Sequence, residues 1–94
     1  MKDKLDITLK IADVELSLNI DRNEEELLRE VAKQVNHAYA KYRQWFSDSP
    51  SEEILAKVTL LFAKGFLQLK QQLTELDSLL EDFDSEFSAL LREN

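Results

Sequence analysis

The stretch "FLQLKQQLTELDSLLEDFDSEF", residues 66–87, decides how this chain is built. Leucine or phenylalanine recurs at every third or fourth position, and polar residues fill almost all the positions between. This is the pattern of a helix with one apolar stripe. No other segment of the chain is long enough to cover the stripe, so the pattern predicts that a second chain covers it and that self-association is central to this protein.

The stripe continues as heptad repeats through a helix that we predict from about Pro50 to Arg92. Ser49 as N-cap, Pro50 at the first helical position and Glu52 three residues after the cap form a strong helix start. Two interleaved rows of seven-residue spacing then supply an almost wholly apolar core, while the positions furthest from it are polar. The oligomerisation coiled coil predicted from this spacing uses Phe62, Phe66, Leu69, Leu73, Leu76, Leu80, Phe83, Phe87 and Leu90.

Charge and residue size along this helix favour an antiparallel neighbour. Residues 54–70 carry three lysines and no acid, whereas residues 71–94 carry seven acids and one arginine. An antiparallel register also brings Lys70 near Asp77 of the second chain, which predicts an inter-chain ion pair. Leu79 and Leu91 widen the seam beyond two strands, which is compatible with four helices. In this register like sizes meet, in the pairs Phe62 with Phe87, Phe66 with Phe83, Leu69 with Leu80 and Leu73 with Leu76.

Residues 5–20 alternate apolar and polar in two runs, the period-2 pattern of two half-buried strands. A two-residue turn at Ala12 and Asp13 would place every apolar residue of one run opposite an apolar residue of the other. The sequence therefore predicts a β-hairpin, although this turn lacks the glycine that tight hairpin turns favour. A lone hairpin is marginal in water, so we expect a helix beneath it. The predicted pairs are Ile11 with Val14, Leu9 with Leu16, Ile7 with Leu18 and Leu5 with Ile20.

A first helix is predicted from the acidic segment "DRNEEELL" to about Phe46. Either Asp21 with Glu24 or Asn23 with Glu26 would form a capping box at its start. Spacings of three and four residues predict one apolar face, made of Leu28, Val31, Val35, Ala38, Tyr42 and Trp45.

The opposite face of this first helix carries a row of basic residues spaced by four. The stretch from Val31 to Phe46 holds no acidic residue at all, in a chain whose net charge is -7. This local reversal of charge is the best candidate for a docking surface. The row, here called the basic stripe, consists of Arg29, Lys33, His37 and Lys41.

Composition limits the remaining classes of function. With 19 acidic against 12 basic side chains, a nucleic-acid binder is disfavoured because it needs a basic footprint. One histidine and no cysteine make a metal site or a disulfide unexpected. The chain has no glycine-rich phosphate loop and no recognisable nucleophile with a base, so we expect no enzyme, cofactor or small-molecule substrate. No signal peptide, membrane span or membrane partner is expected either.

The predicted fold class is α+β: a globular head over residues 1–67, and a coiled-coil extension of the second helix over residues 68–94. In its order of parts the chain resembles the family of the bacterial cell division protein ZapA. The segments that carry the resemblance are "ITLKIADVELSLNI", "DRNEEELLREVAKQVN", "SPSEEILAKVTLLFA" and the long acidic coil. The resemblance implies a head that dimerises, a coil that joins two dimers antiparallel into a tetramer, and a cytoplasmic location at the division site.

The resemblance further implies binding to FtsZ, the tubulin-like division GTPase, and cross-linking and bundling of its protofilaments. It assigns the docking role to the basic stripe, acting on an acidic filament surface. Family members usually have a glycine in the hairpin turn, often beside a basic residue, whereas this chain has Ala12 and Asp13. This departure leaves the turn without the basic contact that the family pattern suggests.

One alternative combines a hairpin with coiled coils in a different order. A chaperone or adaptor of prefoldin type, not acting on FtsZ, carries its hairpin between two coiled-coil arms. In this chain the hairpin comes first and the coil last, which favours the ZapA-like cross-linker.

Overall fold

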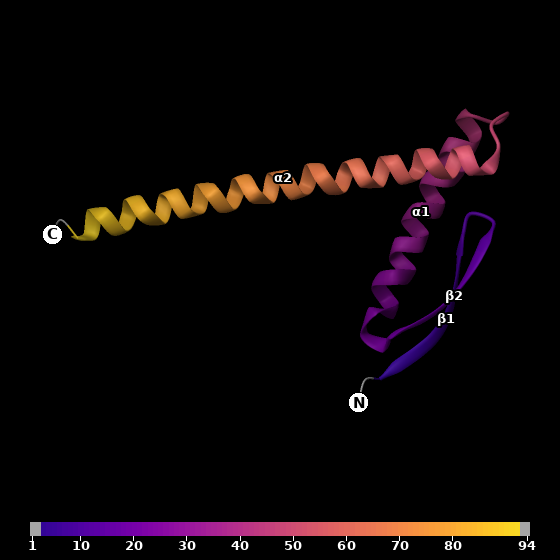
Figure 1. Ribbon diagram of the computed structural model, residues 1–94, viewed down its shortest axis with the longest axis horizontal. Helices are drawn as coiled ribbons and strands as arrows, with labels where there is room; N and C mark the ends of the chain where they lie inside the picture. Colours follow the sequence, from indigo (N-terminus) through magenta and orange to yellow (C-terminus); the bar gives the residue numbers. More distant parts are fainter. Residues whose placement is uncertain (1–2, 93–94) are drawn as a thin grey trace. The chain divides into compact units, whose positions relative to one another are not determined.

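The computed structural model describes residues 3–92, apart from the side chains of Phe87 and of residues 90–92. Two strands precede the helices, as the predicted α+β class requires (Figure 1). The chain divides into two compact units between Leu60 and Leu61. The sequence pattern predicts the end of the head after residue 67. We call residues 3–60 the head and residues 61–92 the seam helix. The elements are β1 (Lys4–Ile11), β2 (Val14–Asp21), the short 3-10 helix η1 (Arg22–Glu24), α1 (Glu25–Trp45) and α2 (Ser51–Arg92).

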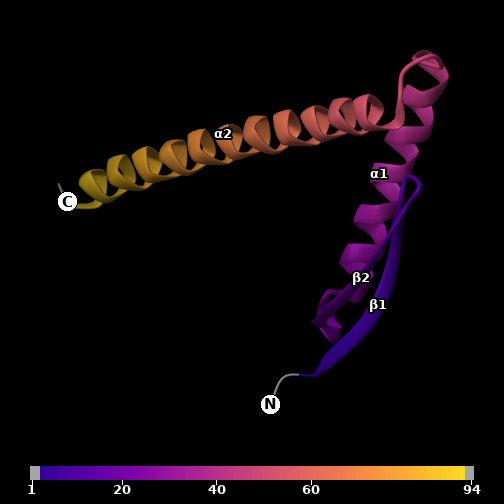
Figure 2. The same cartoon turned by 45° about the vertical axis from the view of Figure 1, so that its right-hand side comes forward.

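The hairpin has the predicted register, and α1 covers it. Ile11 pairs with Val14 and each following pair matches an apolar residue with an apolar residue, down to Leu5 with Ile20. The hairpin lies along α1 in both views (Figures 1 and 2). Ile7 and Leu9 of β1 are buried together with Ala32 of α1. The helix thus supplies the cover that a two-stranded sheet needs in water.

The hairpin turn is held from outside by Asn36 of α1. Ala12 has a φ of 56°, a left-handed conformation that glycine adopts more easily than alanine. The backbone N–H of Ala12 donates to Asn36 Oδ1 at 2.6 Å, and Asn36 Nδ2 donates to the carbonyl of Lys10 at 2.7 Å. One side-chain amide therefore hydrogen-bonds both a backbone N–H within the turn and a backbone carbonyl of the strand before it. These two bonds explain how the Ala12–Asp13 turn forms without glycine.

The start of the first helix differs from the predicted capping box. A turn of 3-10 helix, η1, comes first, and neither Asp21 before η1 nor Glu24 before α1 caps a helix with its side chain. Instead, Arg22 closes the segment against the hairpin by donating its backbone N–H to the carbonyl of Asp3 at 2.9 Å. Acidic residues do occupy the first turn of α1, where they oppose the positive end of the helix dipole.

The buried face of α1 agrees in part with the predicted one, since Leu28, Val35, Ala38 and Tyr42 lie in or against the core of the head. The structure buries Ala32 and Tyr39 alongside Ala38. Val31 and Trp45, both predicted to face the core, are exposed. The prediction failed here because α1 must contact β1 and the start of α2 at once, and the small side chain of Ala32 allows the strand to approach closely.

The first turns of α2 complete the core of the head. Ile54 is fully buried and Val58 is nearly so, in one cluster with Ala38 and Tyr39 of α1. The helix begins at Ser51, one residue after the predicted start, and the carbonyl of Pro50 accepts its first hydrogen bonds.

Arg43 fastens the connection between α1 and α2. Its guanidinium donates to the carbonyl of Ser49 at 2.7 Å, to Ser51 Oγ at 2.8 Å and to the hydroxyl of Tyr39 at 3.2 Å. A planar guanidinium offers several donors in a fixed fork, so one side chain can hold three acceptors. Arg43 therefore has a structural task in the head, although it lies in the acid-free stretch of α1.

Candidate assembly and docking surfaces

The heptad row of the seam helix remains exposed in the single chain. Its side chains are all more than two fifths exposed, although they are the largest apolar groups of the unit. The predicted row members Phe87 and Leu90 lie outside the described side chains. A contiguous exposed apolar row marks an interaction site. The described members of this heptad row are Phe62, Phe66, Leu69, Leu73, Leu76, Leu80 and Phe83.

The charges of the seam helix divide along its length. Lys64 and Lys70 lie in its first part, whereas residues 71–92 carry six acids and one basic residue, Arg92. Lys70 and Asp77 are both exposed, so both are accessible to a second chain. The ion pair between them stays a prediction.

A second exposed apolar surface lies on the head, and sequence reasoning did not find it. Its four members are 48%, 40%, 65% and 46% exposed. The period-2 pattern predicted that the apolar side chains of both strands would be covered, but one helix covers mainly β1. The sequence did contain a signal for this surface. Each strand has four apolar residues, and one face of a single helix is too narrow to cover all eight. We call this surface the apolar belt; its members, in the same order, are Val14, Leu16, Leu27 and Val31.

The basic stripe is exposed along the whole of α1, but its members differ. Arg29 donates from Nε to the carboxylate of Glu25 at 2.9 Å, so its charge is already paired. Lys33, His37 and Lys41 take part in none of the ion pairs formed within residues 3–92. The lysines of the stripe that are open to a partner are therefore Lys33 and Lys41.

An aromatic cluster adjoins the C-terminal end of the stripe. Trp45 is 61% exposed, and its ring lies 5.6 Å from that of Tyr42. Lys41 Nζ lies 5.1 Å from the centre of the Trp45 ring, and Lys57 Nζ lies 3.5 Å from that of Phe46. Exposed aromatic rings beside cations are frequent at the centres of protein interfaces. At this end the predicted docking surface therefore combines charge with apolar area.

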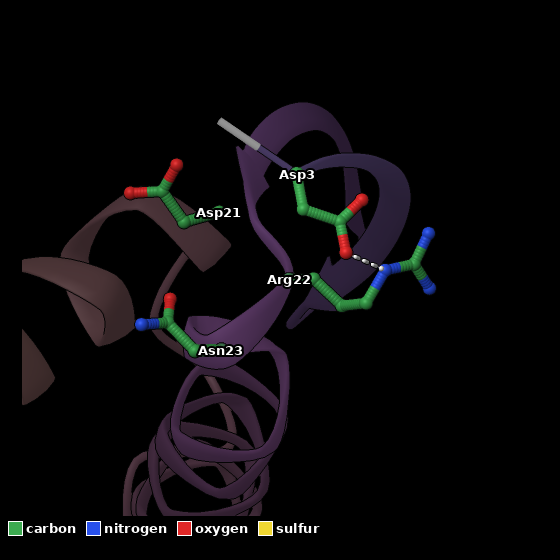
Figure 3. Close-up of a pocket in the computed structure, with 4 residues that line it drawn as sticks. All are labelled: Asp3, Asp21, Arg22 and Asn23. Carbon is green, nitrogen blue, oxygen red and sulfur yellow. Dashed lines mark hydrogen bonds and ion pairs between the residues drawn. The ribbon is translucent and has the colours of Figure 1, made fainter. Parts of the chain in front are cut away.

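The open end of the hairpin is hollowed, but its charges neutralise one another (Figure 3). Arg22 Nε donates to Asp3 at 2.9 Å, while Asp21 and Asn23 extend to the other side of the chain. Lys4 Nζ lies 3.1 Å from Asp21 Oδ1, which makes an ion pair without the angle of a hydrogen bond. The ion pair between Asp3 and Arg22 holds the start of β1 against η1. Together with the pair between Lys4 and Asp21, it balances the charges around the hollow without a ligand.

Residues 3–92 contain neither a cluster suited to a metal ion nor a helix suited to a bilayer. No group of three or more His, Asp or Glu side chains in this part of the chain is arranged to hold a metal ion. Over the same residues, no helix has the length and apolar character needed to cross a bilayer.

The fold and these surfaces define a class of protein: a small α+β head followed by a long helix whose heptad row is open to association. The family is shown by comparison with family models. Residues 7–94 match the model described as cell division protein ZapA, which is nearly the whole chain. The chain therefore belongs to the ZapA family, a non-enzymatic family of cell division proteins associated with FtsZ. A search of curated proteins and a search of solved structures returned no match.

Proposed function

We propose that this protein binds FtsZ filaments and cross-links them as a tetramer, promoting assembly of the division ring at the division site in the cytoplasm. The observation that carries the proposal is the exposed heptad row of the seam helix. A cross-linker needs at least two docking surfaces held apart, and a coiled coil of seam helices with heads at both ends supplies them. The role is mechanical, so it requires no catalysis, cofactor or small-molecule substrate.

The size of the row supports assembly through the seam. Burying one leucine or phenylalanine side chain contributes about 1.5 to 3 kcal/mol. The row of seven described residues repeats in every chain, so their summed burial exceeds an association cost of roughly 4 to 15 kcal/mol. The division of charge along the helix favours the antiparallel arrangement, in which Lys70 of one chain meets Asp77 of another. The same arrangement sets the heads at opposite ends.

We assign docking to the basic stripe, mainly to Lys33, His37 and Lys41, with Arg29 paired internally. Exposed ion pairs contribute only about 0 to 1 kcal/mol each. Attachment of one head to an acidic filament surface is therefore weak, and the tetramer gains its avidity from several heads acting together. Because exposed charges are screened by ions, binding weakens as salt is raised.

The test uses purified FtsZ filaments assembled with GTP. Binding is measured by co-sedimentation and bundling by light scattering, for the wild type and for the double variant Leu73→Lys and Leu76→Lys. The matched control is Gln71→Lys and Ser78→Lys, which adds the same charges at the positions furthest from the seam. We expect the seam variant to bind filaments without bundling them, whereas the control does both.

Two outcomes would contradict the proposal. Equal bundling by the seam variant would show that the seam does not join the cross-linking units. Absence of filament binding by the wild type, together with suppressed aggregation of an unfolded client protein, would support the alternative hypothesis of a prefoldin-like chaperone or adaptor.

A further inference from the structure

The helix that contains the seam has no feature that would bend it sharply. α2 runs unbroken from Ser51 to Arg92, and both views draw it as one helix (Figures 1 and 2). Sharp kinks in helices arise almost always at proline, at glycine–serine pairs or at bulges. α2 contains no proline and a single glycine, Gly65, which has no serine beside it. A coil made of such helices is therefore a rod whose length follows from the number of residues in it.

The heptad row fixes how far two antiparallel seam helices overlap. In the register that joins like sizes, Phe66 lies opposite Phe83 of the partner subunit, and Leu73 lies opposite Leu76 of the partner subunit. A slip of one heptad in either direction would set Phe66 against a leucine and leave its layer unevenly filled. Side-chain size therefore selects one overlap, in addition to the division of charge along the helix.

This overlap separates the two head boundaries by a defined distance. The head ends at Leu60, which in this register lies level with residue 89 of the partner subunit. About 29 residues of helix therefore separate Leu60 from its own copy, which is roughly 44 Å at 1.5 Å per residue. The separation changes only if residues are added to the seam or removed from it.

The outer surface of the seam has the charge opposite to that of the basic stripe. Residues 61–89 carry six acids against two lysines. Three of these acids lie outside the heptad row, are exposed, and take part in none of the ion pairs among the described residues: Glu75, Glu81 and Asp82. Exposed charges act over about 10 Å at 0.1 M salt. An acidic filament that attracts the basic stripe therefore repels the seam.

We propose that the seam is an acidic spacer of fixed length, which sets the distance between the filaments that the heads join. The inference rests on the proposed function and adds to it a quantity that cross-linking alone does not specify. Heads attached at both ends hold two filaments at the distance that the seam allows. The charge of the seam keeps it from lying along either filament. The filament spacing in a bundle therefore follows from the number of heptads in the seam.

Insertion of whole heptads tests the spacer without disturbing the seam. The inserted segment, QQQLTEL, is a copy of residues 70–76 with glutamine in place of Lys70, and it is placed once or twice after Leu76. It extends the apolar row in phase, so phenylalanine still meets phenylalanine and Lys70 still meets Asp77 of the partner subunit. The matched control has the same segment appended after Asn94, beyond the paired row.

The readout is the spacing between FtsZ filaments in bundles, measured by cryo-electron microscopy. We expect the spacing to increase by about 10 Å for one insertion and by about 20 Å for two. The appended control should keep the wild-type spacing. Unchanged spacing in bundles of the insertion variants would overturn the proposal. Absence of bundling by the wild type would instead contradict the proposed function, so the two failures are distinguishable.

A measurement without filaments applies to an insertion variant that fails to bundle. The chain has no cysteine, so Leu60→Cys, at a side chain that is 71% exposed, provides one site for a spin label. The distance between labels at opposite ends of the tetramer should increase by about 10 Å for each insertion. A tetramer that shows this increase but does not bundle would overturn the proposal, because the filaments would then dictate the spacing. Loss of the tetramer, or an unchanged distance, would overturn it as well.

The charge of the spacer is tested by removing its outward acids. The triple variant Glu75→Gln, Glu81→Gln and Asp82→Asn keeps the heptad row and the length of the seam. At low salt we expect its bundles to lose the single spacing of the wild type, because a neutral seam can lie along a filament. The control, Gln71→Asn with Ser78→Asn, alters outer residues without changing charge and should keep that spacing. An unchanged single spacing in the triple variant would overturn the electrostatic part of the proposal.

Discussion

The head and the seam helix are made from similar apolar residues, yet only the head covers them within the chain. Ile54, on the first turns of α2, is 0% exposed because α1 closes over it. Leu73 and Leu76, further along the same helix, remain exposed. The comparison teaches that one continuous helix can contribute to a unimolecular core at one end and to an interface at the other. Ile54 is therefore buried within a single chain, whereas Leu73 and Leu76 can be buried only against a second chain.

The largest effect is expected from charging the seam. Replacing Leu73 and Leu76 by lysine removes two buried leucines per chain, which costs about 3 to 6 kcal/mol for each chain in the assembly. The mass by light scattering should fall from a tetramer to a dimer, while the head stays folded. Gln71→Lys with Ser78→Lys should keep the mass. A seam variant that remains tetrameric at micromolar concentration would break the distinction between the two regions.

The next largest effect is expected in the core of the head. Ile54→Ala leaves a cavity between α1 and α2 and should lower the free energy of unfolding by about 2 to 5 kcal/mol. The loss should be the same at high and low protein concentration, as measured by urea denaturation. Leu60→Ala, at a side chain that is 71% exposed, is the matched control and should change stability by less than about 0.5 kcal/mol. Equal losses in the two variants would mean that burial does not separate these positions.

A smaller gain is expected at the hairpin turn. Ala12→Gly relieves the positive φ of 56° but adds freedom to the unfolded chain, so the net gain in head stability should be about 0.5 to 1 kcal/mol. Thermal unfolding of the head reports the change. The control is Ala40→Gly, at an exposed interior position of α1, which should be destabilising. A loss of stability in Ala12→Gly would show that packing of the Ala12 methyl group against the core of the head outweighs the relief of the positive φ.

The smallest effect is expected at Gly65 of the seam helix. A Cβ added there meets nothing within 4 Å in the single chain, so Gly65→Ala should raise helix stability by about 1 kcal/mol or less. Circular dichroism against temperature measures the gain, and light scattering measures the assembly. If the helix gains stability while the tetramer weakens, a second helix approaches closely at Gly65. That result would sharpen the comparison, because it would locate a contact that only the assembly contains.

Periodicity alone was sufficient for the elements with one clear environment. The hairpin register followed from matching Leu5 with Ile20 at one end and Ile11 with Val14 at the other. The long second helix followed from an unbroken 3.5-residue spacing after Pro50. In both segments an unbroken period of 2 or 3.5 residues specifies a strand or a helix whatever covers each position, so the local pattern is sufficient.

Tertiary contacts overrode local signals where one element serves several neighbours. The expected capping box at Asp21 or Asn23 gave way to a 3-10 turn closed by the bond from Arg22 to Asp3. The predicted apolar face of α1 included Trp45, which the structure exposes beside Lys41. These outcomes depend on packing against segments distant in sequence.

The sequence by itself determined the strands, the long helix and its heptad row, because each depends on a repeat that adjacent residues carry. Only the tertiary structure decided which apolar residues the head leaves uncovered. Val31 is exposed because α1 turns Ala32 toward β1. Burial is a property of several elements packed together, and a single repeat does not encode it.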